Sequence, residues 1–480
     1  MSTPEQWDLV VLGGGSAGIV AAKTAAGLGA RVLLVERDRT GGDCLWTGCV
    51  PSKALLAAAE AAAAARGGAR LGVDVADMQV DFGRVMAHVR AAIAEIEPVD
   101  SPAALAEAGV TVRHGHARFT GEGTLDVDGE PVHFTQAVLA TGAAPALPPI
   151  PGLADVDPLT SDSVWDLPEA PRRLAILGAG TVGCELGQGL ARLGVEVTLV
   201  EGAPRVLPRE DADAATAVHR ALEADGVRLR PGRSVTAVEA TGGGAGSLRL
   251  EDGGSIGFDR LLVAVGRRPR TDDLGLDAVG VAVDDRGFVV VDPRLRTTNQ
   301  RIRAAGDLTG HPQFTHVAGV HGSIAASNAV LGVRRSVDTA AVPRVTYTQP
   351  EVAAVGIDTG RERPGVRLLT LAHEHVDRAV TEGRTDGLTR LAVDRRGRIL
   401  GATVVGPRAG ETLGELALAV RRGLRTRDLA GITHAYPTWN DGAWHAAIAD
   451  VREQLARPAT RRALHGIART RRWWLERRAG

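Results

Sequence analysis

The chain has 480 residues, of which 24% are charged, and its formal net charge at pH 7 is −1. A chain of this length is expected to form about three domains, and its balanced net charge gives no reason to expect a nucleic-acid partner. The first residues lack the basic segment, apolar run and cleavage site of a signal peptide, and no uncharged apolar run reaches about 18 residues. These patterns predict a cytoplasmic protein without a membrane-spanning helix.

The first predicted unit is an apolar strand at residues 9–12, a glycine-rich loop, a helix at 19–27 and a second strand at 31–35 that ends at Glu36. The loop has the spacing G-x-G-x-x-G, with Gly13, Gly15 and Gly18. Glycines at this spacing let the backbone approach a pyrophosphate at the N-terminus of the helix. An acid at the end of the second strand accepts hydrogen bonds from ribose hydroxyls. The segment therefore predicts a dinucleotide site.

Two cysteines follow in the sequence GGDCLWTGCVPSK at residues 41–53. A close pair such as Cys44 and Cys49 indicates redox chemistry or metal binding when the thiols lie in a reducing compartment. A closed metal site needs about four ligands, and the only other cysteine, Cys184, lies far away in the sequence. We therefore predict a redox-active disulfide and no metal site.

The nucleotide-binding pattern recurs after an apolar strand at residues 174–177, and the following strand at 197–200 ends at Glu201. The loop glycines are Gly178, Gly180 and Gly183. Two dinucleotides in one chain are what hydride transfer from a nicotinamide to a flavin requires, although one loop could instead hold only packing glycines. Glu201 suits a free ribose 2′-hydroxyl and repels a 2′-phosphate, which favours NADH over NADPH.

The C-terminal third has local signals of its own. Apolar runs at 388–393 and 399–405 flank the turn Asp394-Arg395-Arg396-Gly397, which predicts a β-hairpin. Residues 411–420 have the spacing of an amphipathic helix.

Further motifs complete the pattern: Ala140-Thr141-Gly142, Ala264-Val265-Gly266-Arg267-Arg268-Pro269, Ala304-Ala305-Gly306-Asp307, and YTQPEVAAVG at 347–356. Together with the cysteine segment and both glycine loops, they resemble the motifs of the class I pyridine nucleotide–disulfide oxidoreductases. That family includes dihydrolipoyl dehydrogenase, glutathione reductase and mercuric reductase. The resemblance covers residues 8–455, which is nearly the whole chain.

The resemblance implies an α/β fold with two Rossmann-like dinucleotide-binding domains, the NAD domain inserted in the FAD domain, and a C-terminal α+β dimerisation domain. The implied boundaries are 1–148 and 270–338 for the FAD-binding domain, 149–269 for the NAD-binding domain, 339–455 for the dimerisation domain and 456–480 for a basic tail. The implied assembly is a homodimer.

The same resemblance implies roles for individual residues. Cys49 is the flavin-side sulfur and Cys44 the interchange thiol that meets the substrate, and a nearby helix N-terminus lowers a thiol pKa. Lys53 lies near the flavin and pairs with Glu185, for which the alternative is an ordinary exposed helix residue. Asp307 holds the ribityl chain of FAD, for which the alternative is a plain turn acid.

The cofactor-binding residues follow from the motifs. For FAD the implied set is Gly13, Gly15, Gly18, Glu36, Thr141, Gly142 and Asp307. For NAD it is Gly178, Gly180, Gly183, Glu201 and Gly266.

The chain departs from the family's disulfide reductases near its end. Those enzymes carry His-Pro-Thr-x-x-Glu, supplied across the dimer, whereas here Tyr436 stands in the His position and Asp441 in the Glu position. His434 lies two residues upstream, outside the register. An imidazole shuttles protons at neutral pH, but a phenol with a pKa of about 10 is a poor base there. Tyr436 resembles the tyrosine of mercuric reductases, yet their cysteine pair near the chain end has no counterpart after Cys184.

These observations predict an FAD-dependent enzyme that takes electrons from NADH and passes them through the flavin and the Cys44–Cys49 disulfide to an unidentified acceptor. The acceptor is a small-molecule disulfide, a metal ion or a quinone. Three alternatives stay open: a mercuric-reductase-like metal or quinone reductase, a dihydrolipoyl dehydrogenase, and a poorly active flavin-binding subunit that serves as a redox sensor.

The tail at residues 457–480 carries eight arginines against one acid, with Trp473 and Trp474 among its apolar residues. One interpretation is an interfacial helix that makes weak contact with an anionic membrane surface. The other is a solvated basic extension that packs its tryptophans on the dimer.

Overall fold

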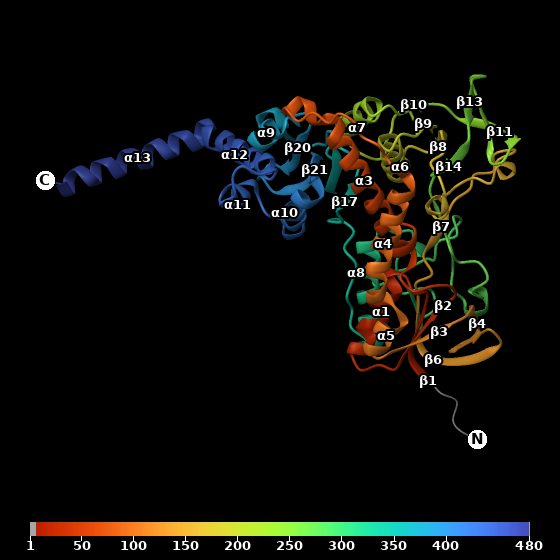
Figure 1. Cartoon of the computed structure of the whole chain (residues 1–480). Helices are drawn as coiled ribbons and strands as arrows, with labels where there is room; N and C mark the ends of the chain where they lie inside the picture. Colours follow the sequence, from red (N-terminus) through yellow and green to blue (C-terminus); the bar gives the residue numbers. More distant parts are fainter. Residues whose placement is uncertain (1–5, 480) are drawn as a thin grey trace. The chain divides into compact units, whose positions relative to one another are not determined.

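The computed structural model describes residues 6–479 (Figure 1). The chain divides into two compact units, one of Met1–Leu207 and Leu222–Thr339 and the other of Pro208–Ala221 and Ala340–Gly480. Each unit is described by itself.

A seven-stranded sheet forms the centre of the first unit. Its strands in spatial order are β3 (Val110–His114), β2 (Val32–Glu36), β1 (Gln6–Leu12), β6 (Glu130–Leu139), β5 (Thr124–Val127) and β4 (Ala117–Gly121), and β16 (Ile302–Ala304) also pairs with β6. The strands β3, β2, β1, β6 and β16 run parallel, whereas β4 and β5 add an antiparallel edge.

The side chains of residues 9–12 in β1 are buried on both faces of this sheet, which explains why this part of the strand is a continuous apolar run in the sequence. Leu9 and Val11 belong to one buried cluster, and Val10 and Leu12 to another. On the first of these faces α1 (Ser16–Gly27) packs against α8 (Thr315–Leu331). The helices approach so closely that a Cβ on Gly322 would collide with the backbone of α1, so small residues replace aromatic ones in this core.

A second, four-stranded sheet is parallel throughout. Its order is β10 (Arg228–Pro231), β9 (Glu196–Glu201), β8 (Arg173–Leu177) and β14 (Arg260–Val263). The helix α6 (Thr181–Arg192) follows β8, and α7 (Ala212–Ala224) follows β9 and spans the boundary between the two units. An antiparallel sheet of β11 (Val235–Gly242), β12 (Ala245–Leu250) and β13 (Ser255–Phe258) lies between β10 and β14 in the sequence.

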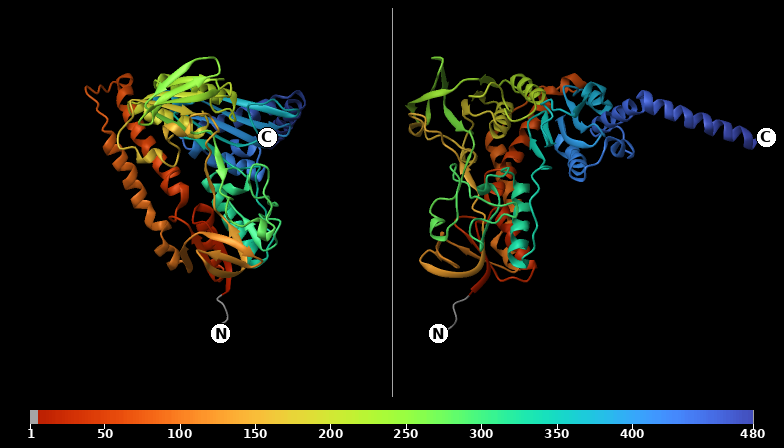
Figure 2. Two further views of the ribbon diagram at one scale, coloured as in Figure 1. Left: turned by 90° about the vertical axis from the view of Figure 1, so that its right-hand side faces the viewer. Right: turned by 180° about the vertical axis from the view of Figure 1, so that it is seen from behind.

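Two antiparallel strands, β7 (Ala143–Pro145) and β15 (Arg267–Pro269), carry the chain into and out of the second sheet. The short helix α2 (Gly42–Trp46) and the longer α3 (Cys49–Gly67) hold the cysteines. The helix α3 lies beside α4 (Phe82–Asp100) and also contacts α6, while α5 (Pro102–Glu107) precedes β3 (Figure 2).

The second unit is built on a five-stranded antiparallel sheet. Its strands in order are β17 (Arg344–Thr346), β18 (Glu351–Gly356), β21 (Ile399–Gly406), β20 (Leu388–Asp394) and β19 (Val366–Ala372). Its helices are α9 (Asp377–Glu382), α10 (Ala409–Arg422), α11 (Thr426–Ala430), α12 (Asp441–Ala456) and α13 (Pro458–Ala479). Buried residues of the sheet, α10 and α12 form one hydrophobic core.

The structure confirms the α/β fold with two Rossmann-like parts and a C-terminal α+β part. The predicted hairpin is β20 and β21, and the predicted amphipathic helix is α10, which starts two residues earlier and ends two residues later than expected. The exact domain boundaries stay a prediction. Among the described helices, none combines the length and apolar character needed to cross a bilayer.

Candidate active site

The first glycine loop joins β1 to α1 and holds the carboxylate of Glu36 at the end of β2. The amide of Gly14 donates to Oε2 of Glu36 at 2.6 Å, and the amide of Asp38 donates to Oε1 at 2.8 Å. Gly13 has a φ of +102°, which a side chain disfavours. A Cβ on Gly18 would collide with the carbonyl oxygen of Gly13. The spacing of the glycines is thus fixed by the contact of the helix with its own loop.

The second loop repeats this geometry between β8 and α6. The amide of Ala179 donates to Oε2 of Glu201 at 2.7 Å, and the amide of Ala203 donates to Oε1 at 2.8 Å. A Cβ on Gly183 would collide with the carbonyl oxygen of Gly178. Both loops therefore fix a carboxylate at the same place beside the N-terminus of a helix.

The open space that a dinucleotide would need lies beside the middle glycine of each loop. The helices α1 and α6 begin directly after Gly15 and Gly180, and no side chain caps either N-terminus. A Cβ on Gly180 would meet nothing within 4 Å, and one on Gly15 would meet its first neighbour at 3.7 Å. Uncapped amides at a helix N-terminus facing free space suit a pyrophosphate. The residues present therefore fit FAD at the first loop and a nicotinamide dinucleotide at the second.

Cys49 is the first residue of α3, and Cys44 lies in α2. Both are free thiols, and the hydrogen bond between them has opposite effects on their pKa values. It lowers the pKa of Cys49 to about 6, with further lowering by Thr315 and by the charge of Lys53. The same contact and burial raise the pKa of Cys44. Cys49 is therefore the sulfur that ionises first.

An ion pair between a partly exposed lysine and a buried glutamate lies one helical turn beyond Cys49. Nζ of Lys53 is 2.9 Å from Oε2 of Glu185 on α6, whose side chain is only 5% exposed. Nζ also donates to the hydroxyl of Ser52 at 3.3 Å. The structure thus brings together two residues that are 132 positions apart, and α3 is joined to the helix that starts at the second nucleotide loop.

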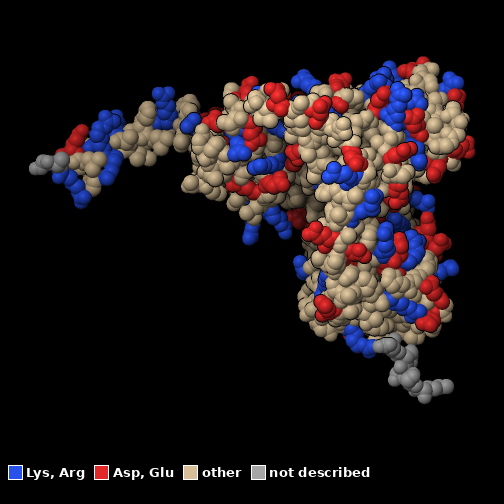
Figure 3. All heavy atoms as spheres, viewed as in Figure 1, with Lys and Arg blue, Asp and Glu red and all other residues tan. Residues whose placement is uncertain are grey.

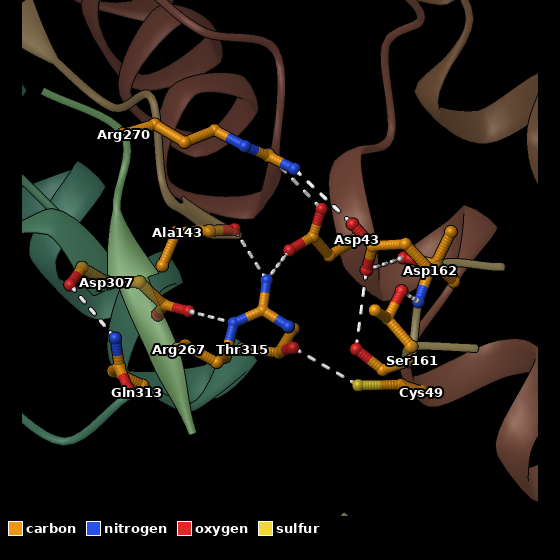
Figure 4. A network of polar contacts seen from close by, with 12 residues as sticks. Asp43, Cys49, Ala143, Ser161, Asp162, Arg267, Arg270, Asp307, Gln313 and Thr315 are labelled. Atoms are coloured by element: carbon orange, nitrogen blue, oxygen red, sulfur yellow. Dashed lines mark hydrogen bonds and ion pairs between the residues drawn. The ribbon is translucent and has the colours of Figure 1, made fainter. Parts of the chain in front are cut away.

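A second network connects the cysteine segment to Asp307 in the 3₁₀ turn after β16 (Figure 4). Arg267 on β15 binds Asp43, donates to the carbonyl of Ala143 at 2.6 Å, and places Nε 3.8 Å from Oδ2 of Asp307. Burial raises the pKa of the Asp307 carboxyl, and the positive charges of Arg267 and Arg270 oppose that rise. Burial likewise lowers the pKa of Arg267.

Arg270 extends the network on the other side of Asp43. It lies 3.4 Å from Oδ1 of Asp43 and 3.7 Å from Oδ2 of Asp162 (Figure 4). Asp162 in turn accepts a 3.4 Å hydrogen bond from Thr47, which lies between the two cysteines. The redox segment is therefore anchored through Asp43 and Thr47 to the chain that enters and leaves the second sheet.

The remaining predicted cofactor residues lie next to β7 and β15, where the chain enters and leaves the second sheet. The hydroxyl of Thr141 donates to the carbonyl of Arg270 at 2.6 Å. Gly142 and Gly266 have φ values of +69° and +142°, and a Cβ on either would meet nothing within 4 Å. Both glycines border open space beside β7 and β15, as a site for an extended cofactor requires.

Tyr436 and Asp441 lie in the second unit, and the structure does not join them. The hydroxyl of Tyr436 donates to Oδ2 of Asp377 at 2.5 Å. This carboxylate raises the pKa of Tyr436. Asp441 is buried, and Oδ2 accepts from the amide of Thr438 at 3.2 Å. Within residues 6–479, no hydrogen bond links Tyr436 to Asp441, so the orienting partner of the phenol is Asp377.

His434 is engaged elsewhere in the same unit. Its Nε2 is 3.0 Å from Oε1 of Glu415, and its ring stacks on Trp444 at a centroid distance of 5.5 Å. These contacts hold the imidazole against α10 and α12.

Three contact residues were absent from the sequence prediction. Thr315 lies 266 positions from Cys49, with its hydroxyl 3.2 Å from the sulfur (Figure 4). Asp377 is 59 positions from Tyr436. Nothing in the spacing indicates either contact. The arginines that contact Asp43 are 224 and 227 positions away, so no local signal in the sequence indicates that contact either.

The chain matches two family descriptions. Residues 7–322 match "Pyridine nucleotide-disulphide oxidoreductase", and residues 342–447 match the dimerisation domain of the same family. The chain belongs to the pyridine nucleotide–disulfide oxidoreductase family. As a member, it is an oxidoreductase that uses FAD and NAD(P)H, and its dimerisation domain supports a homodimer.

Relatives with different named activities are similarly close. The chain is 38% identical to a mercuric reductase from Streptomyces lividans over 447 residues, covering 90% of this chain and 94% of the relative. It is 37% identical to a dihydrolipoyl dehydrogenase from Thermus scotoductus (strain ATCC 700910 / SA-01), covering 92% and 96%. These near-equal identities show the family without deciding the acceptor of this oxidoreductase.

Solved structures of the family share the fold. The flavoprotein disulfide reductase RclA from Escherichia coli, as its Cu(II) complex, superposes with a TM-score of 0.83 at 28% identity, covering 93% of this chain and 99% of RclA. LpdA from Mycobacterium tuberculosis gives 0.84 at 29% identity, covering 92% and 99%. The oxidoreductase therefore has the fold of a flavoprotein disulfide reductase over nearly its full length.

Proposed function

We propose that this oxidoreductase passes two electrons from NADH through FAD to the Cys44–Cys49 disulfide and from there to an acceptor. Bound FAD would accept the hydride and relay its electrons. Two electrons and one proton break the S–S bond and leave a thiolate at one sulfur and a thiol at the other. The observation that carries the proposal is the placing of Cys49 at the start of α3, with the Thr315 hydroxyl 3.2 Å from its sulfur and the Lys53–Glu185 ion pair one turn further along. These contacts and the hydrogen bond from Cys44 lower the pKa of Cys49 to about 6, which favours a thiolate at neutral pH.

We assign different roles to the two sulfurs. Cys49 is the flavin-side sulfur, since the hydrogen bonds from Cys44 and Thr315 and the charge of Lys53 all stabilise its anion. Cys44 keeps its proton until a reaction partner removes it, because its pKa is raised. Cys44 is then the interchange thiol that meets the acceptor, and it must lose its proton to react because the thiolate is the reactive form. Glu185 balances the charge of Lys53 and keeps the lysine in place beside Cys49.

NADH is the proposed donor in preference to NADPH. Both oxygens of Glu201 accept backbone hydrogen bonds, which fixes the carboxylate at the end of β9. A ribose 2′-hydroxyl can donate to a carboxylate in this position, whereas a 2′-phosphate would be repelled. The geometry therefore supports a ribose without a phosphate.

The hydrogen bond between Tyr436 and Asp377 bears on which kind of electron acceptor the enzyme uses. A phenol whose pKa is raised by Asp377 keeps its proton at neutral pH and can donate a hydrogen bond but not act as a base. That favours an acceptor that needs no basic group here, such as a metal ion or a quinone. The mercuric reductase relatives and the Cu(II) complex of RclA support the metal ion. The dihydrolipoyl dehydrogenase relative supports a disulfide as the second candidate.

Single cysteine variants test the proposal. Cys44→Ser should keep the long-wavelength absorption of a thiolate beside oxidised flavin and lose all disulfide reduction. Cys49→Ser should lose both. Cys184→Ala is the matched control, since its sulfur is buried and donates to the carbonyl of Ala179, and it should change neither.

The acceptor is identified by NADH oxidation with lipoamide, Hg²⁺, Cu²⁺ and a soluble quinone in turn. An undiminished rate in Cys44→Ser with the acceptor that the native enzyme reduces would refute the assigned role of Cys44. The absence of turnover with every acceptor would favour the redox-sensor alternative.

A further inference from the structure

The helix α13 carries a feature that electron transfer does not use. It holds seven arginines against one glutamate in 22 residues. Its side chains are exposed along almost its whole length, and no arginine of α13 forms an ion pair with an acid among the described residues. Basic side chains gather along it in the space-filling view (Figure 3). A lone helix of this kind is only marginally stable in water and needs a surface to lie on.

The apolar residues of α13 form a stripe. Leu464, Ile467, Trp474 and Leu475 recur at helical spacing, about 100° per residue, and fall on one side. They are 42%, 66%, 38% and 48% exposed. Trp473 lies on the opposite side, about half a turn from Leu464. The stripe is therefore apolar surface that no part of the described chain covers.

Two arginines that lie within the arc of the stripe stack on its tryptophan. The guanidinium groups of Arg471 and Arg478 lie 4.5 and 4.1 Å from the ring centroid of Trp474. Long arginine side chains can cover an apolar face and still reach outward with their charge. Exposed apolar side chains interleaved with arginines suit a helix that lies in the plane of a lipid headgroup layer.

We propose that α13 binds the surface of an anionic phospholipid bilayer, with Leu464, Ile467, Trp474 and Leu475 inserted among the headgroups. Charge complementarity argues for this partner, because α13 carries seven arginines and only one acid to balance them. A second copy of α13 would bring the same positive charge against the first. Nucleic acid would match the charge but would leave the apolar stripe in water.

The holoenzyme is mixed with vesicles of phosphatidylglycerol and phosphatidylcholine, or of phosphatidylcholine alone, and floated through a density gradient. The protein should float only with the anionic vesicles, and high salt should release it because it shortens electrostatic range. Trp474→Ser with Leu475→Ser should weaken binding at least tenfold. Trp473→Ser is the matched control on the opposite side and should retain binding within about twofold.

Three results would overturn the proposal. The first is no flotation with anionic vesicles at low salt. The second is equal loss in the Trp473 and Trp474 variants, which would leave no role for the stripe. The third is evidence for a different partner. Tighter binding to a DNA duplex than to the vesicles would indicate nucleic acid, and conversion of the dimer to a monomer when the chain is ended after Ala456 would indicate that α13 binds the other subunit. Unchanged NADH oxidation in all variants separates these results from any failure of the proposed redox function.

Discussion

The hydroxyl of Thr315 is a direct test of how Cys49 is made acidic. The two atoms lie 3.2 Å apart, and when the sulfur is ionised only the hydroxyl can donate. Replacing Thr315 by valine keeps the shape of the side chain and removes the donor. Thr315 is exposed at the start of α8, so the change should affect folding little.

The size of the effect follows from the energy of one charged hydrogen bond. Such bonds contribute about 1.5–3 kcal/mol, and one pKa unit corresponds to about 1.4 kcal/mol. Thr315 is exposed, so water can replace part of the lost hydrogen bond and the lower end of this range applies. The pKa of Cys49, about 6 in the native protein, should rise to about 7 in Thr315→Val.

The assay is a pH titration of the two-electron-reduced enzyme, followed by the long-wavelength absorption of the thiolate beside the flavin. Because the pKa of Cys49 is lowered, the band should appear as the pH rises through about 6. In Thr315→Val the midpoint should move about one unit toward alkaline pH. Thr315→Ser retains the hydroxyl and should titrate like the native enzyme.

Thr309→Val is a matched control, because the buried hydroxyl of Thr309 donates to the carbonyl of Gly306 and touches no sulfur. An unchanged midpoint in Thr315→Val would refute the reasoning. So would an equal shift in Thr309→Val, because the effect would then not depend on contact with Cys49.

Three further substitutions test other contacts. Asp377→Asn should lower the pKa of Tyr436 toward its ordinary value of about 10, because the carboxylate that repels the phenolate is gone; ultraviolet titration measures it in a chain with two tyrosines, and an unmoved transition would contradict the pairing. Asp43→Asn should reduce the free energy of unfolding by about 1–2 kcal/mol, because it removes the negative charge between two arginines. The control Asp272→Asn, in an ion pair whose side chains are 67% exposed, should change it by less than about 0.5 kcal/mol. Equal melting temperatures for the two variants would contradict a stabilising role of the Asp43 network. Glu201→Ser should raise the ratio of kcat/KM for NADPH to that for NADH by about tenfold, a change of about 1.4 kcal/mol; a constant ratio would show that other residues select the donor.

Sequence patterns predicted the parts of the fold that are determined by residues close together in the chain. Both glycine loops, their flanking strands and the hairpin at β20 and β21 depend on residues within about thirty positions of one another. Glu36 and Glu201 could be placed for the same reason, since each ends the strand next to its loop. The pairing of Lys53 with Glu185 came from family resemblance, because no local rule joins residues on two separate helices.

The contacts that the sequence did not reveal are set by tertiary packing. Thr315 reaches Cys49 because α8 starts beside α3, and this closeness depends on the fold of the whole first unit. Tyr436 was aligned with a motif in which the residue five positions later orients it. Its hydroxyl instead meets Asp377 at the start of α9, a contact that motif spacing cannot encode.

The central claim is that electrons from NADH reach the Cys44–Cys49 pair. It is tested most directly by anaerobic titration of the purified enzyme with NADH while the visible spectrum is recorded. The account predicts a long-wavelength thiolate–flavin band that is complete after two electrons per flavin. Direct bleaching of the flavin with no such band would contradict it, because the cysteines would then lie outside the path of the electrons.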